Sequence, residues 1–268
     1  MLSPAYFKER AKLAWYYMVG VLGLRNGDVI LTSFPRSGNT WLRFMFCNLL
    51  NIKEREAQEV TFPDLDQIMP ELGASNLLRT WQFDVIPRVV KTHREYWPIF
   101  RSNESILLIR DPRDVMNSYY DYKRRDRIDK FGGSFSEFIR CRRLGIPAWA
   151  YHFKTWVDHA DHIVSYEKMK DNDTQVFSNL INKMNVKVGK EVVKKAVQKS
   201  RFDKVQSAEE SVQEENYFQF NNKTRFAREG NTNQWHDKFS ERDISFYRNV
   251  LRKYDIYRLV PKEYIDSS

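Results

Sequence analysis

The chain has little cysteine. Its 268 residues include two, Cys47 and Cys141, and neither has a partner at the spacing of a zinc motif. This argues against a zinc site and a disulfide framework, and it fits a reducing compartment. Cys47 lies in an apolar stretch with helical periodicity, which indicates a small buried hydrophobic side chain. We therefore expect a cytoplasmic protein.

Internal repeats, low-complexity segments and long Gly/Ser/Pro linkers are also missing. Hydrophobic residues make up 42% of the chain and aromatic residues 15%, which is enough for a sizeable core. A chain of this length without a linker predicts one domain, and we assign residues 1–268 to it.

No apolar run is long enough to span a bilayer. The run at residues 13–24, "LAWYYMVGVLGL", follows Lys8, Arg10 and Lys12 as in a signal peptide, but no small-x-small cleavage site is evident. We expect residues 1–25 to include an amphipathic helix that packs on the domain, with peripheral membrane contact as the alternative.

Acidic side chains are outnumbered by basic ones. The chain has 44 Lys and Arg against 35 Asp and Glu, which gives a formal net charge of +9. This balance favours an anionic partner such as nucleic acid, anionic lipid or a phosphate-rich small ligand. Solubility alone is the alternative explanation.

Short apolar runs alternate with helical stretches along the chain. The strand-like runs lie at 28–34, 87–92, 105–110 and 162–166. Helical stretches follow at 40–51, 114–125, from the fourth strand to about residue 184, at 189–199 and at 241–254. The alternation predicts an α/β fold with a central parallel sheet flanked by helices. The polar stretch 216–234 predicts a long loop.

The stretch "TSFPRSGNTWLR" at residues 32–43 joins the first predicted strand to a helix. The free N–H groups at a helix N-terminus bind anions, and Gly38 lets a ligand approach the backbone. Ser37 and Thr40 add hydroxyls, and Arg36 adds a forked cation. The stretch lacks the glycine spacing of a Walker loop and of a dinucleotide loop, so it predicts an anion site of another kind. An ordinary strand-to-helix turn is the alternative.

Lys91 and His93 lie at the end of the second predicted strand, in "VVKTHREY". Ligands of open α/β sheets bind at the carboxyl ends of the strands. A histidine there can serve as a general base, and a lysine can stabilise negative charge on a transferring group. A structural histidine is the alternative.

Two further stretches carry basic residues suited to anions. In "LLIRDPRDVMNSYYDY", Arg110 ends a strand and Ser118 lies in the following helix, so both can reach one anion. In "RFAREGNTNQW", Arg228 and Gly230 lie in the predicted long loop. For the first stretch, the alternative is a solvated charged loop in which Asp111, Arg113 and Asp114 pair among themselves. For the second, it is a mobile basic loop.

Taken in this order, the motifs resemble those of cytosolic-type sulfotransferases, over about residues 26–242. That family transfers a sulfuryl group from 3′-phosphoadenosine 5′-phosphosulfate (PAPS) and has a P-loop-like nucleotide-binding fold. "TSFPRSGNTW" is similar to the family's T-Y-P-K-S-G-T-T-W, "KTH" to K-T-H, and "RDPRDVMNSYY" to R-x-P-x-D-x-x-x-S-Y-Y. "SYEKM", "KSRFDKV" and "REGNTNQW" are similar to Y-E-D-M, [ST]-S-F-x-x-M and R-K-G-x-x-G-D-W.

The resemblance implies roles for these positions. His93 would be the catalytic base, and Lys91 and Arg36 would lie at the sulfuryl group. The implied nucleotide-binding residues are Arg36, Ser37, Gly38, Asn39, Thr40, Trp41, Arg110, Ser118, Tyr166, Ser200, Phe202, Arg228, Glu229 and Gly230. The implied product is 3′-phosphoadenosine 5′-phosphate (PAP), and no metal is required.

The chain departs from the family pattern at several positions. Arg36 and Glu229 replace lysines, Asn39 replaces a threonine, and Asn233 replaces the second loop glycine. The family's dimer motif is missing from "WHDKFSERD" at residues 235–243, so we expect a monomer or an atypical dimer.

The resemblance places the acceptor pocket among segments near 8–24, 62–86, 119–152 and 216–227, which are rich in aromatic residues. They indicate either an aromatic pocket or plain core packing. We expect a small-molecule acceptor with a hydroxyl or amine, the N-terminal helix on or near the pocket, and no nucleic acid partner. The competing hypotheses are a P-loop nucleotide kinase, which should have a lysine where Asn39 stands, and a basic nucleic-acid-binding protein.

Overall fold

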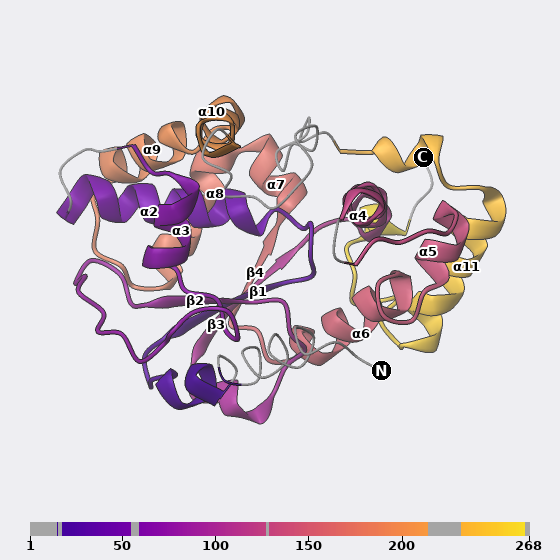
Figure 1. The fold of residues 1–268 in the computed structure, drawn as a ribbon, viewed down its shortest axis with the longest axis horizontal. Helices are drawn as coiled ribbons and strands as arrows, with labels where there is room; N and C mark the ends of the chain where they lie inside the picture. The colour runs from indigo at the N-terminus through magenta and orange to yellow at the C-terminus, as the bar shows by residue number, and fades with distance from the viewer. Residues whose placement is uncertain (1–14, 16–17, 55–58, 127–128, 214–231, 266–268) are drawn as a thin grey trace, which may run out of the picture.

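The computed structural model describes residue 15 and residues 18–54, 59–126, 129–213 and 232–265. Its centre is a four-stranded sheet in the order β2-β1-β3-β4, with all neighbours parallel. The strands are β1 (Val29–Ser33), β2 (Val89–Thr92), β3 (Glu104–Ile109) and β4 (His162–Ser165). Their carboxyl ends meet at one edge of the sheet (Figure 1). The predicted parallel α/β fold is therefore confirmed.

The strands are apolar on both faces, because each face is covered by helices. Alternate side chains enter different clusters: Val29 and Leu31 of β1 lie in one core, and Ile30 lies in the other. In β3, Ile106 joins the first core and Leu107 the second. This two-sided burial explains why the strand sequences are continuous apolar runs.

Two groups of helices cover the sheet (Figure 1). The first core is closed by α2 (Asn39–Glu54), α3 (Phe62–Ile68), α8 (Asp173–Lys183), α9 (Lys190–Lys199) and α10 (Phe202–Gln213). The second is closed by α4 (Pro112–Arg125), α5 (Phe135–Arg140), α6 (Ile146–Val157) and α11 (Glu241–Lys253). The short helix α7 (Tyr166–Asp171) continues β4, and the 3-10 turns are η1 (Pro98–Phe100), η2 (Gln234–Asp237) and η3 (Lys262–Tyr264).

The four predicted strands agree with the observed ones to within two residues at each end. Helices α3, α5, α6 and α10 were not predicted. Local signals for three of them exist: capping boxes begin α3 at Thr61 and α5 at Ser134, and Gly145 precedes α6 with a proline in its first turn. Most of the predicted loop 216–234 lies outside the described residues, and Gln234 begins η2.

The described part of the N-terminal segment includes helical residues 18–23. Val19 on this helix is buried, whereas Trp15, Met18 and Leu22 are exposed. No helix among the described residues is both long and apolar enough to cross a membrane.

Candidate active site

The loop between β1 and α2 has an unusual backbone. Arg36 has φ 70° and Gly38 has φ 96°, so both lie in the left-handed region. An arginine backbone adopts that region only at a steric cost, which contacts with the surrounding structure must offset. Strained backbone conformations of this kind are common at ligand sites. α2 begins at Asn39, directly after the loop, and its first turn presents backbone N–H groups at the carboxyl ends of the strands.

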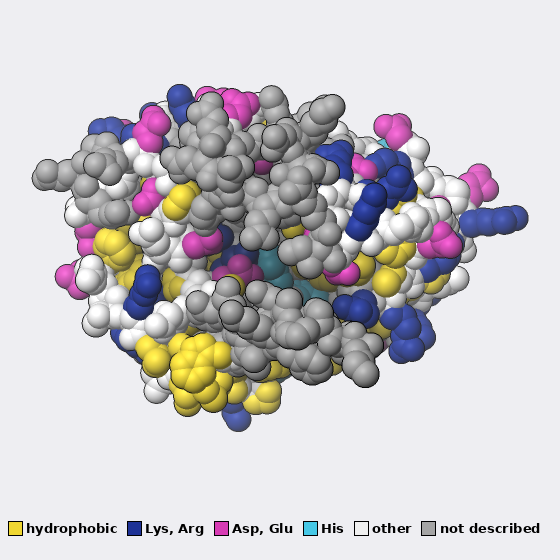
Figure 2. Space-filling view, viewed as in Figure 1, with side chains coloured by type: hydrophobic (Ala, Val, Ile, Leu, Met, Phe, Trp, Pro, Cys, Tyr) yellow, Lys and Arg dark blue, Asp and Glu magenta, His cyan; other side chains and the backbone are white. Residues whose placement is uncertain are grey.

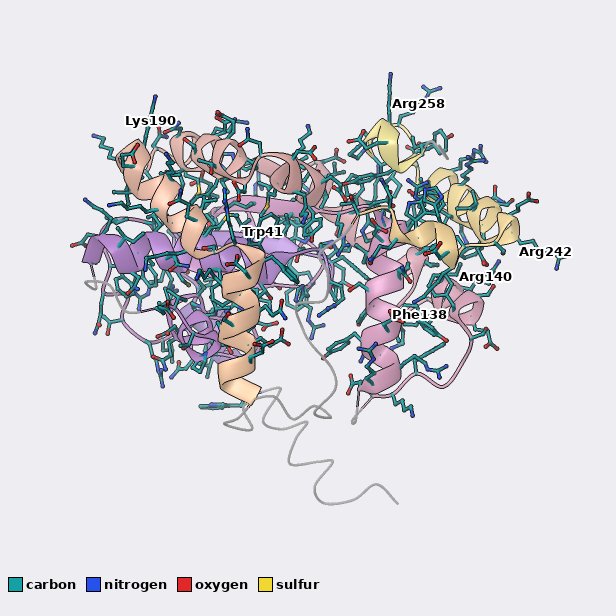
Figure 3. All side chains as sticks on the ribbon, turned by 90° about the horizontal axis from the view of Figure 1, so that it is seen from above. Trp41, Phe138, Arg140, Lys190, Arg242 and Arg258 are labelled. Atoms are coloured by element: carbon teal, nitrogen blue, oxygen red, sulfur yellow. The ribbon has the colours of Figure 1, made fainter. Side chains whose placement is uncertain are left out.

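Tyr166 packs directly against Gly38. A Cβ atom on Gly38 would lie 2.5 Å from Cδ2 of the tyrosine ring, so only glycine fits there. Trp41 meets the same ring edge-on, with 5.8 Å between ring centroids. In Figure 3, Trp41 lies near the start of α2, beside α10. The loop, the end of β4 and α2 thus form one aromatic wall.

We predict that Gly38→Ala destabilises the fold by about 1–3 kcal/mol, the range for a residue forced into a disfavoured backbone conformation. The new methyl group would also displace the Tyr166 ring. Urea unfolding at neutral pH measures the effect. Gly132→Ala is the matched control, because Gly132 has open space around it and no positive φ, and it should change stability by less than about 0.5 kcal/mol. Equal stabilities for the two variants would refute the prediction.

Two side-chain hydrogen-bond donors of the loop and the first turn of α2 are buried without a hydrogen-bond partner among the described residues. They are Ser37 Oγ and Trp41 Nε1. A buried polar group without a partner costs about 1–3 kcal/mol, so such atoms call for an explanation. A bound anion with several acceptor oxygens would supply partners, and the residues of this loop fit a phosphate group.

Arg110 and Ser118 form a basic corner of the cleft beside the loop. Arg36 Nε donates to Ser118 Oγ at 3.2 Å, and Arg110 Nη1 donates to the carbonyl oxygen of Arg36 at 3.3 Å. The guanidinium of Arg110 lies 4.3 Å from the centroid of the Tyr166 ring. Arg36 is therefore directed toward α4. Two guanidinium groups, a hydroxyl and an aromatic ring come from four separate parts of the chain to one place.

His93 follows β2, and its tautomer is determined by its neighbour. Nδ1 lies 2.7 Å from the carbonyl oxygen of Ser33 at the end of β1. A carbonyl oxygen only accepts, so Nδ1 carries the hydrogen and Nε2 keeps its lone pair. Burial and the Lys91 ammonium lower the pKa of His93 to about 4. The ring is therefore neutral near pH 7, as a general base must be.

Lys91, two residues before His93, is paired with Glu71. The distance from Lys91 Nζ to Glu71 Oε2 is 2.7 Å. Glu71 lies in the segment after α3, and nothing in the sequence marked it as a partner of Lys91. Arg43 on α2 is buried nearby and contributes to the electrostatic surroundings of both side chains.

These groups share one cleft of about 470 Å³. Of the thirteen sequence-predicted site residues that the structure describes, eleven line it: Arg36, Gly38, Asn39, Thr40, Trp41, Lys91, His93, Arg110, Ser118, Tyr166 and Phe202. Figure 2 shows histidine and acidic side chains at the bottom of a hollow in the middle of one face. The motifs that are far apart in sequence therefore meet at the carboxyl edge of the sheet.

Two of the predicted residues do not line the cleft: Ser37, which is buried in the loop, and Ser200. The Ser200 hydroxyl donates to the carbonyl oxygen of Ala196 and accepts from Asn48 Nδ2, so it ties α9 to α2 behind the cleft wall. Phe202, two residues later, does line the cleft. The predicted residues Arg228, Glu229 and Gly230 lie outside the described residues.

The acidic residues at the start of α4 are structural. Asp111 caps the helix and pairs with Arg113, and both are buried; burial raises the pKa of Asp111 to about 6. Asp114 accepts the backbone N–H groups of Asn233 and Trp235. Asp114 therefore attaches the segment that carries Gln234, a cleft-lining residue, to α4. The alternative of a solvated loop is wrong, because these side chains are buried, although the pairing that it expected is present between Asp111 and Arg113.

The chain matches known proteins over most of its length. The family model for the sulfotransferase domain matches residues 26–259. The chain belongs to the sulfotransferase domain family. Sulfotransferase 1B1 of Canis lupus familiaris is 25% identical over 198 residues, which cover 67% of this chain and 66% of the relative. Sulfotransferase 6B1 of Pan troglodytes is 26% identical over 160 residues, 55% of this chain and 52% of the relative. The matched part thus spans less than two thirds of the length of these relatives.

Solved structures share the fold. Mouse sulfotransferase SULT7A1 complexed with PAP superposes with a TM-score of 0.68 at 17% identity, over 93% of this chain and 94% of that one. Retinol dehydratase in a complex with retinol and PAP gives a TM-score of 0.71 at 17% identity, over 91% and 86%. The predicted sulfotransferase fold is confirmed.

Several residues of this sulfotransferase domain that line the cleft were not predicted. Glu71 contacts the lining residue Lys91, and the lining itself includes Tyr122, Lys123 and Val205. Tyr122 lies on the helix of Ser118, one turn further on, so helical spacing was the signal that could have found it. Lys123 pairs with Asp126, which lies three residues further on, at helical spacing. It also pairs with Asp129, which sequence spacing did not indicate.

His152 on α6 is a second buried histidine in the sulfotransferase domain. Its Nε2 lies 3.2 Å from Thr32 Oγ1, and burial together with the charge of His93 lowers its pKa to about 3. The unfolded chain would protonate this ring near pH 6.5, so unfolding takes up a proton below that pH. The stability that depends on neutral His152 is complete above about pH 6.5 and is lost as the pH falls toward 3.

We predict that His152→Gln reduces the acid sensitivity of the fold. Between pH 7 and pH 5 the wild type should lose about 2 kcal/mol of unfolding free energy through His152, and the variant should lose about that much less. Urea unfolding at both pH values measures the difference, so a general destabilisation of the variant does not matter. Equal losses in the two proteins would contradict the prediction.

Proposed function

We propose that this sulfotransferase domain transfers a sulfuryl group from PAPS to a hydroxyl or amine of a small-molecule acceptor. One observation carries the proposal: a neutral histidine with a free Nε2 lone pair shares a cleft with the start of α2 and with the basic corner formed by Arg110 and Ser118. The folds that resemble this one include structures with bound PAP. The cleft thus combines a base with sites for the two phosphate-bearing ends of a 3′,5′-bisphosphorylated adenosine.

The proposed binding roles follow the geometry. Ser37, Thr40 and the first backbone N–H groups of α2 hold the 5′-phosphate, and Arg110 with Ser118 holds the 3′-phosphate. Trp41, Tyr166 and Phe202 flank the adenine. Arg228, Glu229 and Gly230 are proposed to complete the 3′-phosphate site. Ser200 acts behind Phe202 through its bonds to α2 and α9.

The proposed reaction is an in-line transfer. Nε2 of His93 takes the proton from the acceptor hydroxyl or amine while the acceptor oxygen or nitrogen bonds to sulfur. The bond from sulfur to the bridging oxygen breaks, and PAP departs with the electron pair. Lys91 and Arg36 stabilise the negative charge on the sulfuryl and bridging oxygens. Catalysis therefore rests on positioning and electrostatics.

Arg36 stands where the family usually has a lysine, and its contacts indicate a different role from that of a lysine. Its Nε is bonded to Ser118, so its charge is fixed between the two proposed phosphate positions. A forked guanidinium can contact both ends of the nucleotide, which a lysine ammonium cannot do at once. We propose that Arg36 couples 3′-phosphate recognition to stabilisation of the leaving group.

The test is an assay with isotopically labelled PAPS and a panel of small phenols, alcohols and amines, with product identified by mass. Sulfated product that depends on PAPS supports the proposal. Phosphorylated product with ATP and magnesium would support the kinase hypothesis instead. Filter binding to DNA and RNA at physiological salt examines the nucleic-acid hypothesis, because charge-driven binding weakens steeply with salt.

The setting of the enzyme is also a proposal. We propose a cytoplasmic enzyme that is a monomer or an atypical dimer, because the residues 235–243 lack the usual dimer motif of the family. Sedimentation of the full chain would determine the oligomeric state. We propose that the N-terminal segment, residues 1–25, packs on or near the acceptor pocket.

A further inference from the structure

Glu71 is attached to β2 by its backbone as well as by its side chain. It forms an isolated parallel bridge with Lys91. The N–H of Lys91 donates to the carbonyl oxygen of Pro70, and the N–H of Leu72 donates to the carbonyl oxygen of Lys91, both at 2.9 Å. Glu71 therefore cannot shift along β2 without breaking these bonds. These backbone bonds fix the position of its carboxylate beside Lys91.

Arg43 also acts electrostatically on this carboxylate and is itself immobilised. It is buried on α2, and its Nη2 donates to the carbonyl oxygens of Leu65 and Met69 and to Asp66. Burial alone raises the pKa of Glu71, but the nearby cations outweigh it, so the pKa lies below its ordinary value. Glu71 is therefore ionised near pH 7, in contact with Lys91 and under the electrostatic influence of Arg43.

For Lys91, burial and the neighbouring guanidinium both favour the uncharged form. Burial lowers the pKa of Lys91, the guanidinium of Arg43 lowers it further, and Glu71 opposes both. The groups that face Lys91 are Glu71 from the bridge segment, Arg43 from α2, Asp66 from α3 and His93 after β2. Glu71 is the carboxylate in direct contact with it. This contact raises the pKa of Lys91 and so opposes the effects of burial and of Arg43.

We infer that Glu71 is a positioning residue for sulfuryl transfer, which holds Lys91 as an ammonium at the cleft edge beside His93. The inference rests on the proposed function, because it assumes that Lys91 stabilises the transferring group. Only 15% of the Lys91 side chain and 29% of the Glu71 side chain are exposed, so removing Glu71 would leave a mostly buried ammonium without its counter-charge. A carboxylate here also repels an anionic ligand, so simple charge counting predicts tighter nucleotide binding without it.

These opposing effects give Glu71→Gln a distinctive phenotype. PAP affinity should stay the same or rise, because a negative charge is removed. kcat should fall about tenfold, as expected for partial loss of a group that stabilises the transition state. The alkaline limb of the kcat profile should move to lower pH by at least one unit, because Lys91 loses the interaction that keeps its proton. Glu71→Asp keeps the charge and should retain the wild-type limb with a smaller loss in kcat.

A second measurement does not require activity. Competitive labelling of lysines with acetic anhydride, read by mass, gives the pH at which Lys91 becomes nucleophilic. This midpoint should fall by at least one unit in Glu71→Gln and stay near wild type in Glu95→Gln, which removes one negative charge from the loop after β2 and keeps the Lys91–Glu71 pair. Near-UV circular dichroism checks that each variant is folded, and Glu71→Ala, which also removes the carboxylate, replaces Glu71→Gln if the latter does not fold.

An unchanged labelling midpoint in Glu71→Gln would overturn the inference. So would weaker PAP binding together with an unshifted pH profile, because that pattern indicates a structural role. If the wild type makes no sulfated product but the midpoint of Lys91 shifts, the proposed function fails and the dependence of Lys91 on Glu71 remains. The two failures are therefore distinguishable.

Discussion

Replacing His93 by alanine should lower sulfuryl transfer by about 10²–10⁴-fold and leave PAP affinity within a few-fold of the wild type. The size of the loss is that of a general base removed from proton transfer. The selectivity follows from the geometry, since His93 contacts the carbonyl oxygen of Ser33, whereas Arg110, at the proposed 3′-phosphate site, donates to the carbonyl oxygen of Arg36. Steady-state kinetics with labelled PAPS and calorimetry with PAP measure the two quantities.

The pH profile provides an independent check on His93. Because burial and Lys91 lower its pKa to about 4, the free enzyme should stay active well below the ordinary titration range of histidine. The acid limb of kcat/KM should therefore lie near pH 4. His162→Gln is the control, because His162 pairs with Glu104 at the edge of the sheet. Turnover near the wild-type value in His93→Ala would remove His93 from the role of base.

Much of the fold could be predicted from the sequence because its signals are local. Strands covered on both faces have continuous apolar sequences, so β1 and β3 could be recognised before any neighbour was known. The loop between β1 and α2 was recognisable as a candidate anion site for the same reason, since strand, Gly38 and helix are consecutive. The short helices α3 and α5 carry weaker periodicity, and their capping residues were the only strong local signals.

The motifs of the candidate site could be predicted from the sequence, but the side chains that interact with the motif residues could not. Lys91 and Arg36 were recognised as cations, whereas their partners Glu71 and Ser118 are chosen by tertiary contacts. Glu71 reaches Lys91 because the segment after α3 runs parallel to the edge strand, which no local pattern specifies. Partners of this kind decide the pKa of a catalytic group, so they must be read from the fold.

The other large expected effect concerns Arg110. Arg110→Ala should weaken PAP binding by about 1.5–3 kcal/mol, the value of a hydrogen bond to a charged group, or roughly 10- to 150-fold. Arg110 is held against the Tyr166 ring and the carbonyl oxygen of Arg36, so its guanidinium is preorganised at the basic corner. Arg258→Ala is the control for loss of one positive charge, because Arg258 is exposed and lies far from Trp41 in Figure 3. Calorimetry with PAP measures both variants.

The choice of nucleotide separates two explanations of that loss. Arg110 also packs on Tyr166, so the variant could weaken binding by disturbing the aromatic wall and not by losing a phosphate contact. Adenosine 5′-phosphate has no 3′-phosphate and uses the same wall. If Arg110 binds the 3′-phosphate, the loss should be large with PAP and nearly absent with adenosine 5′-phosphate. An equal loss with both nucleotides would place the 3′-phosphate elsewhere, and Arg110→Lys, which keeps the charge without the fork, would then behave like Arg110→Ala.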